Sequence, residues 1–222
     1  MLTLAIDTST NILSLALGRE GKLLASVNEL TQNNHSAILM SKINHLITTA
    51  NLTPANLEQI VVAQGPGSYT GIRVGVVTAK SLAYALRVPV IGISSLKCLA
   101  HTIAVDNGVL APMIDARRGT VFASALAHDG RTLISEGHYD LKDFLSQLAN
   151  QQVTFIGDGA VVNAETIITT MPSATITKAT AITRSKAEVL ASLALKASKV
   201  ANIHGLLPNY LRKTEAEQKL NG

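Results

Sequence analysis

The loop Gly65-Pro-Gly-Ser-Tyr-Thr-Gly71 joins the β-branched stretch "IVVAQ" to a helix-like stretch. A strand that exits into a helix points backbone N–H groups outward, and the amino-terminal end of a helix attracts anions such as phosphate. No Gly-Lys-Ser/Thr follows, so the loop is not a Walker A motif, and it misses the GxGxxG spacing by one position. Gly71 and Gly75 share one face of the expected helix, which predicts close packing. A phosphate cradle and a packing turn both stay open, and we favour the packing turn.

Two carboxylates, Asp7 and Asp115, each follow an isoleucine at the end of an apolar stretch. In a duplicated fold with a cleft between its halves, one strand-end carboxylate from each half would face a Mg²⁺-nucleotide. The candidate phosphate-binding residues around them are Thr8, Ser9, Arg117, Arg118, Gly157 and Gly159. The alternative is that both aspartates only cap turns, which is a common role of this residue.

Other catalytic centres have little support in the sequence. The histidines are scattered, with His35 and His45 ten residues apart, and no HExxH occurs, so we expect no metal site. No GxSxG occurs either. The single cysteine, Cys98, lies in "SSLKCLAHT" on an expected helix, where a core position is favoured over a nucleophile paired with His101.

The elements that would position these residues occur twice. "LAIDTSTNILSLALGREGKLLA" and "PMIDARRGTVFASALAHDGRTLI" each contain a strand ending in Ile-Asp, a polar turn, an alternating strand, a charged Gly turn and another strand. Helical periodicity follows over 36–50 and 70–86, each flanked by short apolar strands. We therefore predict an α/β protein with an internal duplication, divided into subdomains 1–105 and 106–222.

Composition narrows the functional classes. The chain has 222 residues, 47% hydrophobic and 15% charged, which is enough for a packed core and argues against disorder. The net charge of +4 permits an anionic partner, but aromatic residues make up only 3% and no dense Lys/Arg patch occurs, so a free-standing RNA-binding protein is not favoured. One cysteine fits a reducing cytoplasm, and the start has neither signal-peptide nor membrane-span character.

Several of these segments together resemble one protein family. "LAIDTST", "NNHSAILMSKI", "GPGSYTGIRVG", "PMIDARRGTVFA", "FIGDGA" and "PNYLR" are similar, in this order and nearly end to end, to segments of the TsaB (YeaZ) family. The resemblance implies the actin-like (ASKHA) fold, with two subdomains that each contain a mixed β-sheet covered by helices. It also implies an accessory role in making threonylcarbamoyladenosine (t6A) in tRNA.

The resemblance further implies partners. A TsaD-type catalytic subunit transfers threonylcarbamoyl to N6 of adenosine 37 in tRNAs that read codons beginning with A, and a small TsaE-type ATPase joins the pair. The chain would contact tRNA only through this complex and would form a homodimer when its partner is absent. The catalytic paralogue carries a metal-binding His-x-x-x-His after the Gly-loop helix and the next strand, and Ser95 and Leu99 stand in those places here. We therefore expect no catalysis by this chain and no cofactor, ATP and Mg²⁺ included.

In the family, the first helices of the amino-terminal subdomain form the dimer surface. The corresponding interface candidates are His35, Ile38, Leu39, Lys42, Ile43, Thr70, Arg73, Val74 and Val77. Two rival functions stay open beside the scaffold. One is a small ATP-dependent kinase or ATPase that uses Asp7 and Asp115. The other, less favoured, is a metalloprotease-like protein.

Overall fold

The computed structural model of the chain describes residues 1–31, 35–177, 185–197 and 203–211. These residues form two compact units. The first contains Met1–Ile103 with the described part of 182–208, and the second contains the described part of Ala104–Ala181 with that of Asn209–Gly222. The helix Lys186–Leu193 belongs to the first unit, where it is buried against the first sheet.

The first unit is built on a five-stranded mixed sheet in the order β3-β2-β1-β4-β5. Its strands are β1 (Leu2–Asp7), β2 (Ile12–Arg19), β3 (Lys22–Leu30), β4 (Gln59–Ala63) and β5 (Val90–Ile93). The central strands β1 and β4 are buried at every position, whereas β3 at the edge has partly buried positions at every second residue from Ala25 to Glu29. This is expected, since a central strand covered on both faces has neither face open to water and is built mostly of apolar residues.

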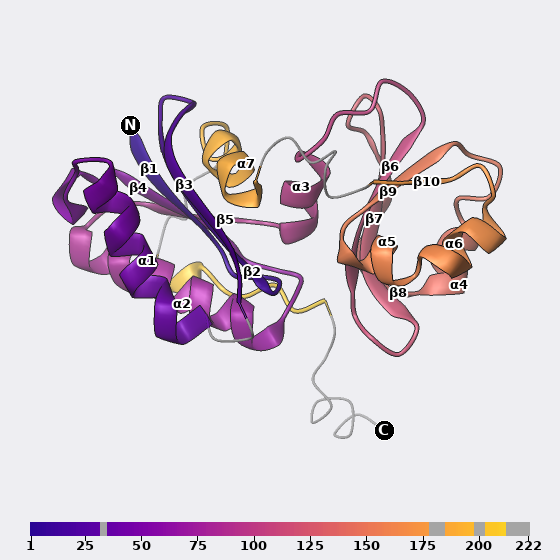
Figure 1. Cartoon of the computed structure of the whole chain (residues 1–222), viewed down its shortest axis with the longest axis horizontal. Coiled ribbons are helices and arrows are strands. Elements are labelled where there is room, and N and C mark those ends of the chain that lie inside the picture. The colour runs from indigo at the N-terminus through magenta and orange to yellow at the C-terminus, as the bar shows by residue number, and fades with distance from the viewer. Residues whose placement is uncertain (32–34, 178–184, 198–202, 212–222) are drawn as a thin grey trace. The chain divides into compact units, whose positions relative to one another are not determined.

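Helices cover both faces of this sheet (Figure 1). Its helices are α1 (His35–Thr49), α2 (Tyr69–Leu86), α3 (Ser95–Ala100) and α7 (Lys186–Leu193), with short 3₁₀ turns at Pro54–Asn56 and Ile203–Gly205. The two long helices α1 and α2 lie on one face, and α7 lies on the other. The helical periodicity predicted α1 and α2 to within one residue at each end.

The second unit repeats the arrangement with shorter helices. Its strand order, β10-β9-β6-β7-β8, is that of the first sheet read from the other edge. The strands are β6 (Val109–Asp115), β7 (Thr120–Ala127), β8 (Thr132–Asp140), β9 (Val153–Ile156) and β10 (Thr175–Ile176), and the helices are α4 (Leu141–Ser146), α5 (Asp158–Val162) and α6 (Ala164–Thr170). The predicted duplication is confirmed, since β1-β2-β3 and β6-β7-β8 are the same antiparallel meander and each central strand also pairs in parallel with a later strand.

Candidate functional site

The turn after β1 holds a fully buried carboxylate. Asp7, Thr8 and Ser9 each have 0% of their surface exposed. One carboxylate oxygen of Asp7, Oδ1, accepts hydrogen bonds from the backbone N–H of Ser9 at 2.7 Å and from its hydroxyl at 2.6 Å. An aspartate that accepts a hydrogen bond from the N–H two residues ahead caps the turn, which is the alternative role considered for Asp7.

The other oxygen of Asp7 faces a lysine from the far end of the chain. Oδ2 makes no hydrogen bond among the described residues, but it lies 3.2 Å from Nζ of Lys186, at the start of α7. The same ammonium donates to Ser9 Oγ at 3.3 Å and to Thr10 Oγ1 at 3.2 Å. The Lys186 side chain is only 14% exposed. A buried carboxylate is tolerated when a neighbouring cation compensates it, so the mostly buried ammonium of Lys186 neutralises Asp7 within the first unit.

The glycine loop packs directly onto this turn. The backbone N–H of Ser68 donates to the carbonyl oxygen of Ser9 at 2.8 Å, and the Thr8 hydroxyl donates to the carbonyl oxygen of Gly71 at 2.7 Å. A Cβ at Gly71 would overlap the carbonyl oxygen of Thr8. The geometry therefore favours the packing turn over the phosphate cradle.

The actin-like fold implies a Mg²⁺-nucleotide at this turn, but the residues of the first unit do not fit one. Oδ1 of Asp7 already accepts two hydrogen bonds, Oδ2 is paired with an ammonium, and the N–H of Ser68 is bonded to Ser9. A Mg²⁺ ion takes oxygen ligands at about 2.0–2.1 Å in near-octahedral geometry, which a buried lysine at the same carboxylate opposes.

In the second unit, the candidates Asp115, Gly157 and Gly159 meet at the ends of two neighbouring parallel strands, β6 and β9. Oδ1 of Asp158 accepts from the N–H of Asp115 at 3.3 Å and from the N–H of Gly159 at 2.9 Å. A Cβ at Gly159 would lie 2.9 Å from the backbone carbon of Ile114. Gly159 thus allows the start of α5 to approach the end of β6 closely, and Gly157 before it has a φ of 110° that favours glycine.

The turn after β6 is more exposed than the turn after β1. Asp115 is half-buried, and its Oδ1 accepts from the N–H of Arg117 at 2.9 Å. Arg117 and Arg118 are exposed, and both have left-handed backbone conformations, with φ of 65° and 53°. Their side chains therefore extend from a tight turn.

The interface candidates on α1 need a correction. Leu39 and Ile43 are 1% and 2% exposed and belong to the core between α1 and the first sheet, so they offer no surface to a partner. His35 is also buried, with Nε2 2.7 Å from the carbonyl oxygen of Thr10. The helical periodicity marked an apolar face, but that face packs inward. Ile38 is half-buried against the same core, and Lys42, also half-buried, forms an ion pair with Glu29.

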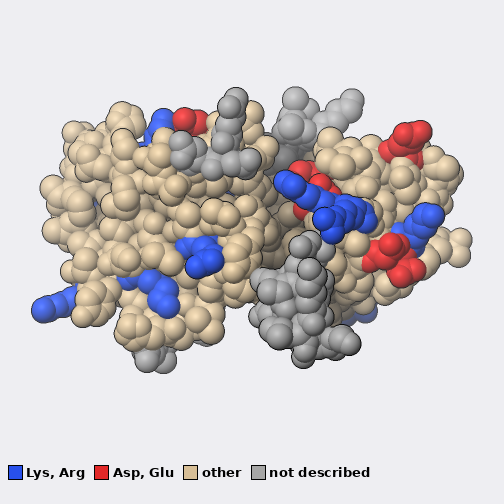
Figure 2. Space-filling view, turned by 90° about the horizontal axis from the view of Figure 1, so that it is seen from below, with Lys and Arg blue, Asp and Glu red and all other residues tan. Residues whose placement is uncertain are grey.

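The interface candidates on α2 are mostly accessible. Thr70, Arg73 and Val77 are exposed, and Val74 is half-buried. The guanidinium of Arg73 stacks on the ring of Tyr69, with its central carbon 5.3 Å from the ring centroid. Figure 2 views the chain from the side on which α1 and α2 lie in Figure 1, and the first unit shows a mostly uncharged surface there with a few charged groups, most of them Lys or Arg.

The segment that would carry a metal-binding His pair has other chemistry here. Ser95 and Leu99, on α3, are both buried, and the Ser95 hydroxyl has no hydrogen-bond partner among the described residues. His101 is exposed at the end of α3, with Nδ1 2.8 Å from the carbonyl oxygen of Lys97. In the described part of the chain, no three His, Cys, Asp or Glu side chains lie close enough to hold one metal ion.

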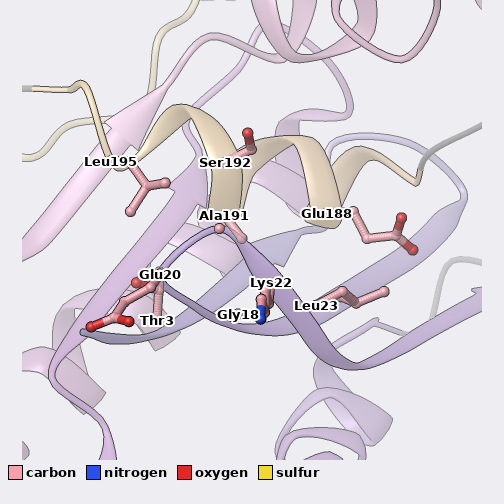
Figure 3. Close-up of a pocket in the computed structure, with 10 residues that line it drawn as sticks. Thr3, Gly18, Glu20, Lys22, Leu23, Glu188, Ala191, Ser192 and Leu195 are labelled. Atoms are coloured by element: carbon pink, nitrogen blue, oxygen red, sulfur yellow. The ribbon is translucent and has the colours of Figure 1, made fainter.

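A pocket of about 390 Å³ lies elsewhere in the first unit, between α7 and the β2–β3 hairpin. In Figure 3, α7 crosses over the hairpin, with Glu188 near one end of the pocket and Leu195 near the other. Its charged lining residues, Glu20, Lys22 and Glu188, have mixed signs. None of the predicted site residues lines this pocket.

Sequence reasoning missed two features. Lys186 reaches Ser9 across 177 positions, and nothing in the local sequence "SKAEVL" marks it as a partner of Asp7. Tyr69 and Tyr84 are 47% and 73% exposed on α2, beside the predicted Val77 at 61%. Tyr69, Val77 and Tyr84 lie on one face of the helix together with Arg73, so the helical spacing in the sequence would have signalled an exposed stripe there.

Comparison with known proteins agrees with the fold and identifies the family. The activator of 2-hydroxyisocaproyl-CoA dehydratase from Clostridium difficile, solved with bound ADPNP, superposes with a TM-score of 0.56 at 12% identity, covering 88% of this chain and 95% of that one. This likeness, with the duplicated sheets, places the chain among proteins of the actin-like fold.

More similar proteins identify the family within this fold. YeaZ from Pseudomonas aeruginosa superposes with a TM-score of 0.74 at 27% identity, over 95% of this chain and 99% of that one. The tRNA threonylcarbamoyladenosine biosynthesis protein TsaB of Bacillus subtilis (strain 168) is 35% identical, over 99% of this chain and 97% of its own length. The family model described as TsaD, tRNA N6-adenosine threonylcarbamoyltransferase, matches residues 26–220. The chain belongs to the TsaB (YeaZ) family.

Proposed function

We propose that this chain is a non-catalytic scaffold and dimerisation subunit of the complex that transfers threonylcarbamoyl to N6 of adenosine 37 in tRNA. The tRNAs are those that read codons beginning with A. Its partners are a TsaD-type catalytic subunit and a TsaE-type ATPase, and it contacts tRNA through the complex. It acts in the cytoplasm, which its single buried cysteine, Cys98, suits. No helix in the described part of the chain is both long and apolar enough to cross a membrane.

The observation that carries the non-catalytic role is the chemistry of α3. Where the catalytic paralogue has two histidines, this chain has a buried hydroxyl, Ser95, and a buried aliphatic side chain, Leu99. One hydroxyl oxygen and one leucine cannot replace two imidazole ligands. His101 lies on the exposed side of the same segment and does not restore the pair.

The exposed stripe on α2 supports the scaffold role. Val77 and Tyr84 are large apolar side chains that stay more than 60% exposed in the isolated chain. The sequences of α1 and α2 contain Lys42, Arg73 and Lys80 but no Asp or Glu. A partner surface with apolar residues and carboxylates would complement this face.

The test is threonine incorporation into tRNA with purified components. The reactions contain a TsaD-type partner, a TsaE-type ATPase and a source of threonylcarbamoyl-AMP, with or without this chain, and one reaction contains this chain without the TsaD-type partner. We expect product only when both chains are present. Product from this chain without the partner would make it an enzyme, and no effect of adding it would overturn the scaffold role.

A charge on α2 tests the interface. We expect Val77→Asp to weaken association with the partner at least tenfold, because it places a carboxylate in an apolar contact. The matched control is Val162→Asp in α5, since Val162 is 67% exposed but lies in the second unit. Affinity is measured by calorimetry or by sedimentation. Equal affinities of the two variants would show that the α2 stripe is not the interface.

A further inference from the structure

The ammonium of Lys186 occupies a small site made of oxygen atoms. Asp7 Oδ2, Ser9 Oγ and Thr10 Oγ1 lie 3.2, 3.3 and 3.2 Å from Nζ. The Ser9 hydroxyl accepts from the ammonium and donates its own proton to Asp7 Oδ1 at 2.6 Å. Carboxylate and hydroxyl oxygens are ligands of hard cations, but these distances suit an N–H donor rather than a metal ion at about 2.0–2.6 Å.

The backbone of α7 is fixed so that the lysine reaches this site. The Cys98 thiol lies 3.0 Å from the carbonyl oxygen of Lys186, and the N–H of Ala187 donates to Ser14 Oγ at 3.1 Å. The Ser185 hydroxyl caps the helix by accepting from the N–H of Glu188 at 3.2 Å. Contacts from α3 and β2 therefore hold the first turn of α7 beside the end of β1.

The packing beneath α7 brings the helix close to the sheet. Ala187 and Leu190 are fully buried and belong to the same core cluster as Ala5 of β1 and Ala16 of β2. Small residues on the sheet allow the helix to approach closely. The carboxylate and the ammonium are thus buried together when α7 docks.

We propose that Lys186 is a built-in cation for Asp7. Its tethered ammonium takes the position that a soluble cation, such as the Mg²⁺ of a nucleotide complex, would take at this turn. It also fastens the returning helix α7 to the first sheet. While α7 is docked, the first unit is complete without nucleotide or metal and does not admit them at Asp7. The role of Lys186 does not depend on the proposed partner or on the tRNA reaction.

The experiment removes the ammonium and supplies a substitute. We expect Lys186→Ala to lower the Tm by roughly 6–20 °C, as expected for a broken buried pair in a chain of this size. Ethylammonium chloride, which offers a small N–H cation, should recover at least a third of that loss. Tetramethylammonium chloride at the same concentration is the salt control, because it has no N–H group and should recover none.

Lys80→Ala is the matched control variant. The Lys80 ammonium also fastens a distant segment, but it donates to the backbone carbonyl oxygens of His204 and Leu206 and not to a carboxylate. Its Tm should differ little between the two ammonium salts, because these carbonyl contacts are exposed or only partly buried and water can replace the lost ammonium. A wild-type Tm for Lys186→Ala, or an equal response of Lys186→Ala to both salts, would overturn the role of Lys186 as a cation.

A second variant separates loss of the cation from failure to fold. Asp7→Asn combined with Lys186→Met replaces the buried pair by uncharged groups of similar size, and it should recover most of the Tm that Lys186→Met alone loses. If the double variant is no more stable than Lys186→Met, the proposal is wrong. A Tm of the wild-type chain that rises with Mg²⁺-ATP, but not with ATP and EDTA, would also overturn it, since nucleotide would then enter beside the lysine.

Discussion

The turn after β1 and the turn after β6 begin with the same Ile-Asp pair, in sheets of the same strand order. In both turns the aspartate accepts a hydrogen bond from the N–H two residues ahead, Ser9 in one and Arg117 in the other. In both, a glycine at the start of a helix packs against the strand exit. Their surroundings differ, because Asp7 is fully buried beside Lys186, whereas Asp115 is half-buried next to two exposed arginines.

The difference shows how one local motif serves two purposes. Covering Asp7 with the glycine loop and α7 removes water from the carboxylate, so the chain must supply the hydroxyl of Ser9 and the ammonium of Lys186 in its place. Asp115 keeps access to water and needs no buried counter-ion. Burial, more than the motif itself, therefore sets what each aspartate requires.

The largest expected contrast is between Asp7→Ala and Asp115→Ala. Asp7→Ala leaves the ammonium of Lys186 buried without its carboxylate, which should cost about 3–5 kcal/mol. Asp115→Ala removes one turn hydrogen bond in a half-buried position and should cost about 0.5–1.5 kcal/mol. Denaturant unfolding measures both. Equal losses would contradict the distinction between the two turns.

The two packing glycines provide the next contrast. We expect Gly71→Ala to lower the free energy of unfolding by about 2–3 kcal/mol, because the added Cβ overlaps a backbone oxygen that cannot rotate away. Gly159→Ala should cost about 1–2 kcal/mol, since its nearest backbone atom is 2.9 Å away and a smaller shift suffices. Thermal unfolding of the two variants side by side measures both losses. A larger loss for Gly159→Ala than for Gly71→Ala would contradict the tighter packing at Gly71.

Glycine at the third position of each turn should act in opposite directions. Arg117 has φ of 65°, and a non-glycine residue pays about 1–2 kcal/mol there, so Arg117→Gly should raise stability by about 0.5 kcal/mol after the entropy cost of glycine. Ser9→Gly should lower stability by about 1–3 kcal/mol, because it removes a buried hydroxyl bonded to Asp7 and Lys186. Urea unfolding tests the signs, and two changes of the same sign would contradict the comparison.

The smallest effect concerns the strand starts. At the start of β1, the N–H of Leu2 donates to the carboxylate of Glu58. This hydrogen bond lowers the pKa of Glu58 below 4.5, although desolvation acts in the opposite direction. At the start of β6, the N–H of Val109 donates instead to the backbone carbonyl of Gln152. A lowered pKa contributes stability above pH 4.5 that is lost as the pH falls through the folded-state pKa. Glu58→Gln should therefore be slightly less stable than wild type at pH 7, with the gap closing in acid. A stability difference between Glu58→Gln and wild type that grows in acid would contradict a lowered pKa for Glu58.

Much of the fold was predictable from local patterns. The periodicity over 70–86 reflects a helix whose residues interact three and four positions apart, so a short stretch of sequence is enough to predict it. The repeated Ile-Asp meander predicted the duplicated sheets for the same reason. The helical spacing of Leu39 and Ile43 also predicted an apolar face on α1, but whether that face meets the sheet or a partner depends on the tertiary arrangement.

The sequence by itself determined the meander, the two long helices, the glycine turn and the absence of a His pair at positions 95 and 99, because each is set by residues close together in the chain. Only the tertiary structure decided that Asp7 is buried and that Lys186 neutralises it. It also decided that Leu39 and Ile43 belong to the core and that α7 returns to the first unit. These features join residues up to 177 positions apart, and the free energy of burying a charge depends on neighbours that no local pattern specifies.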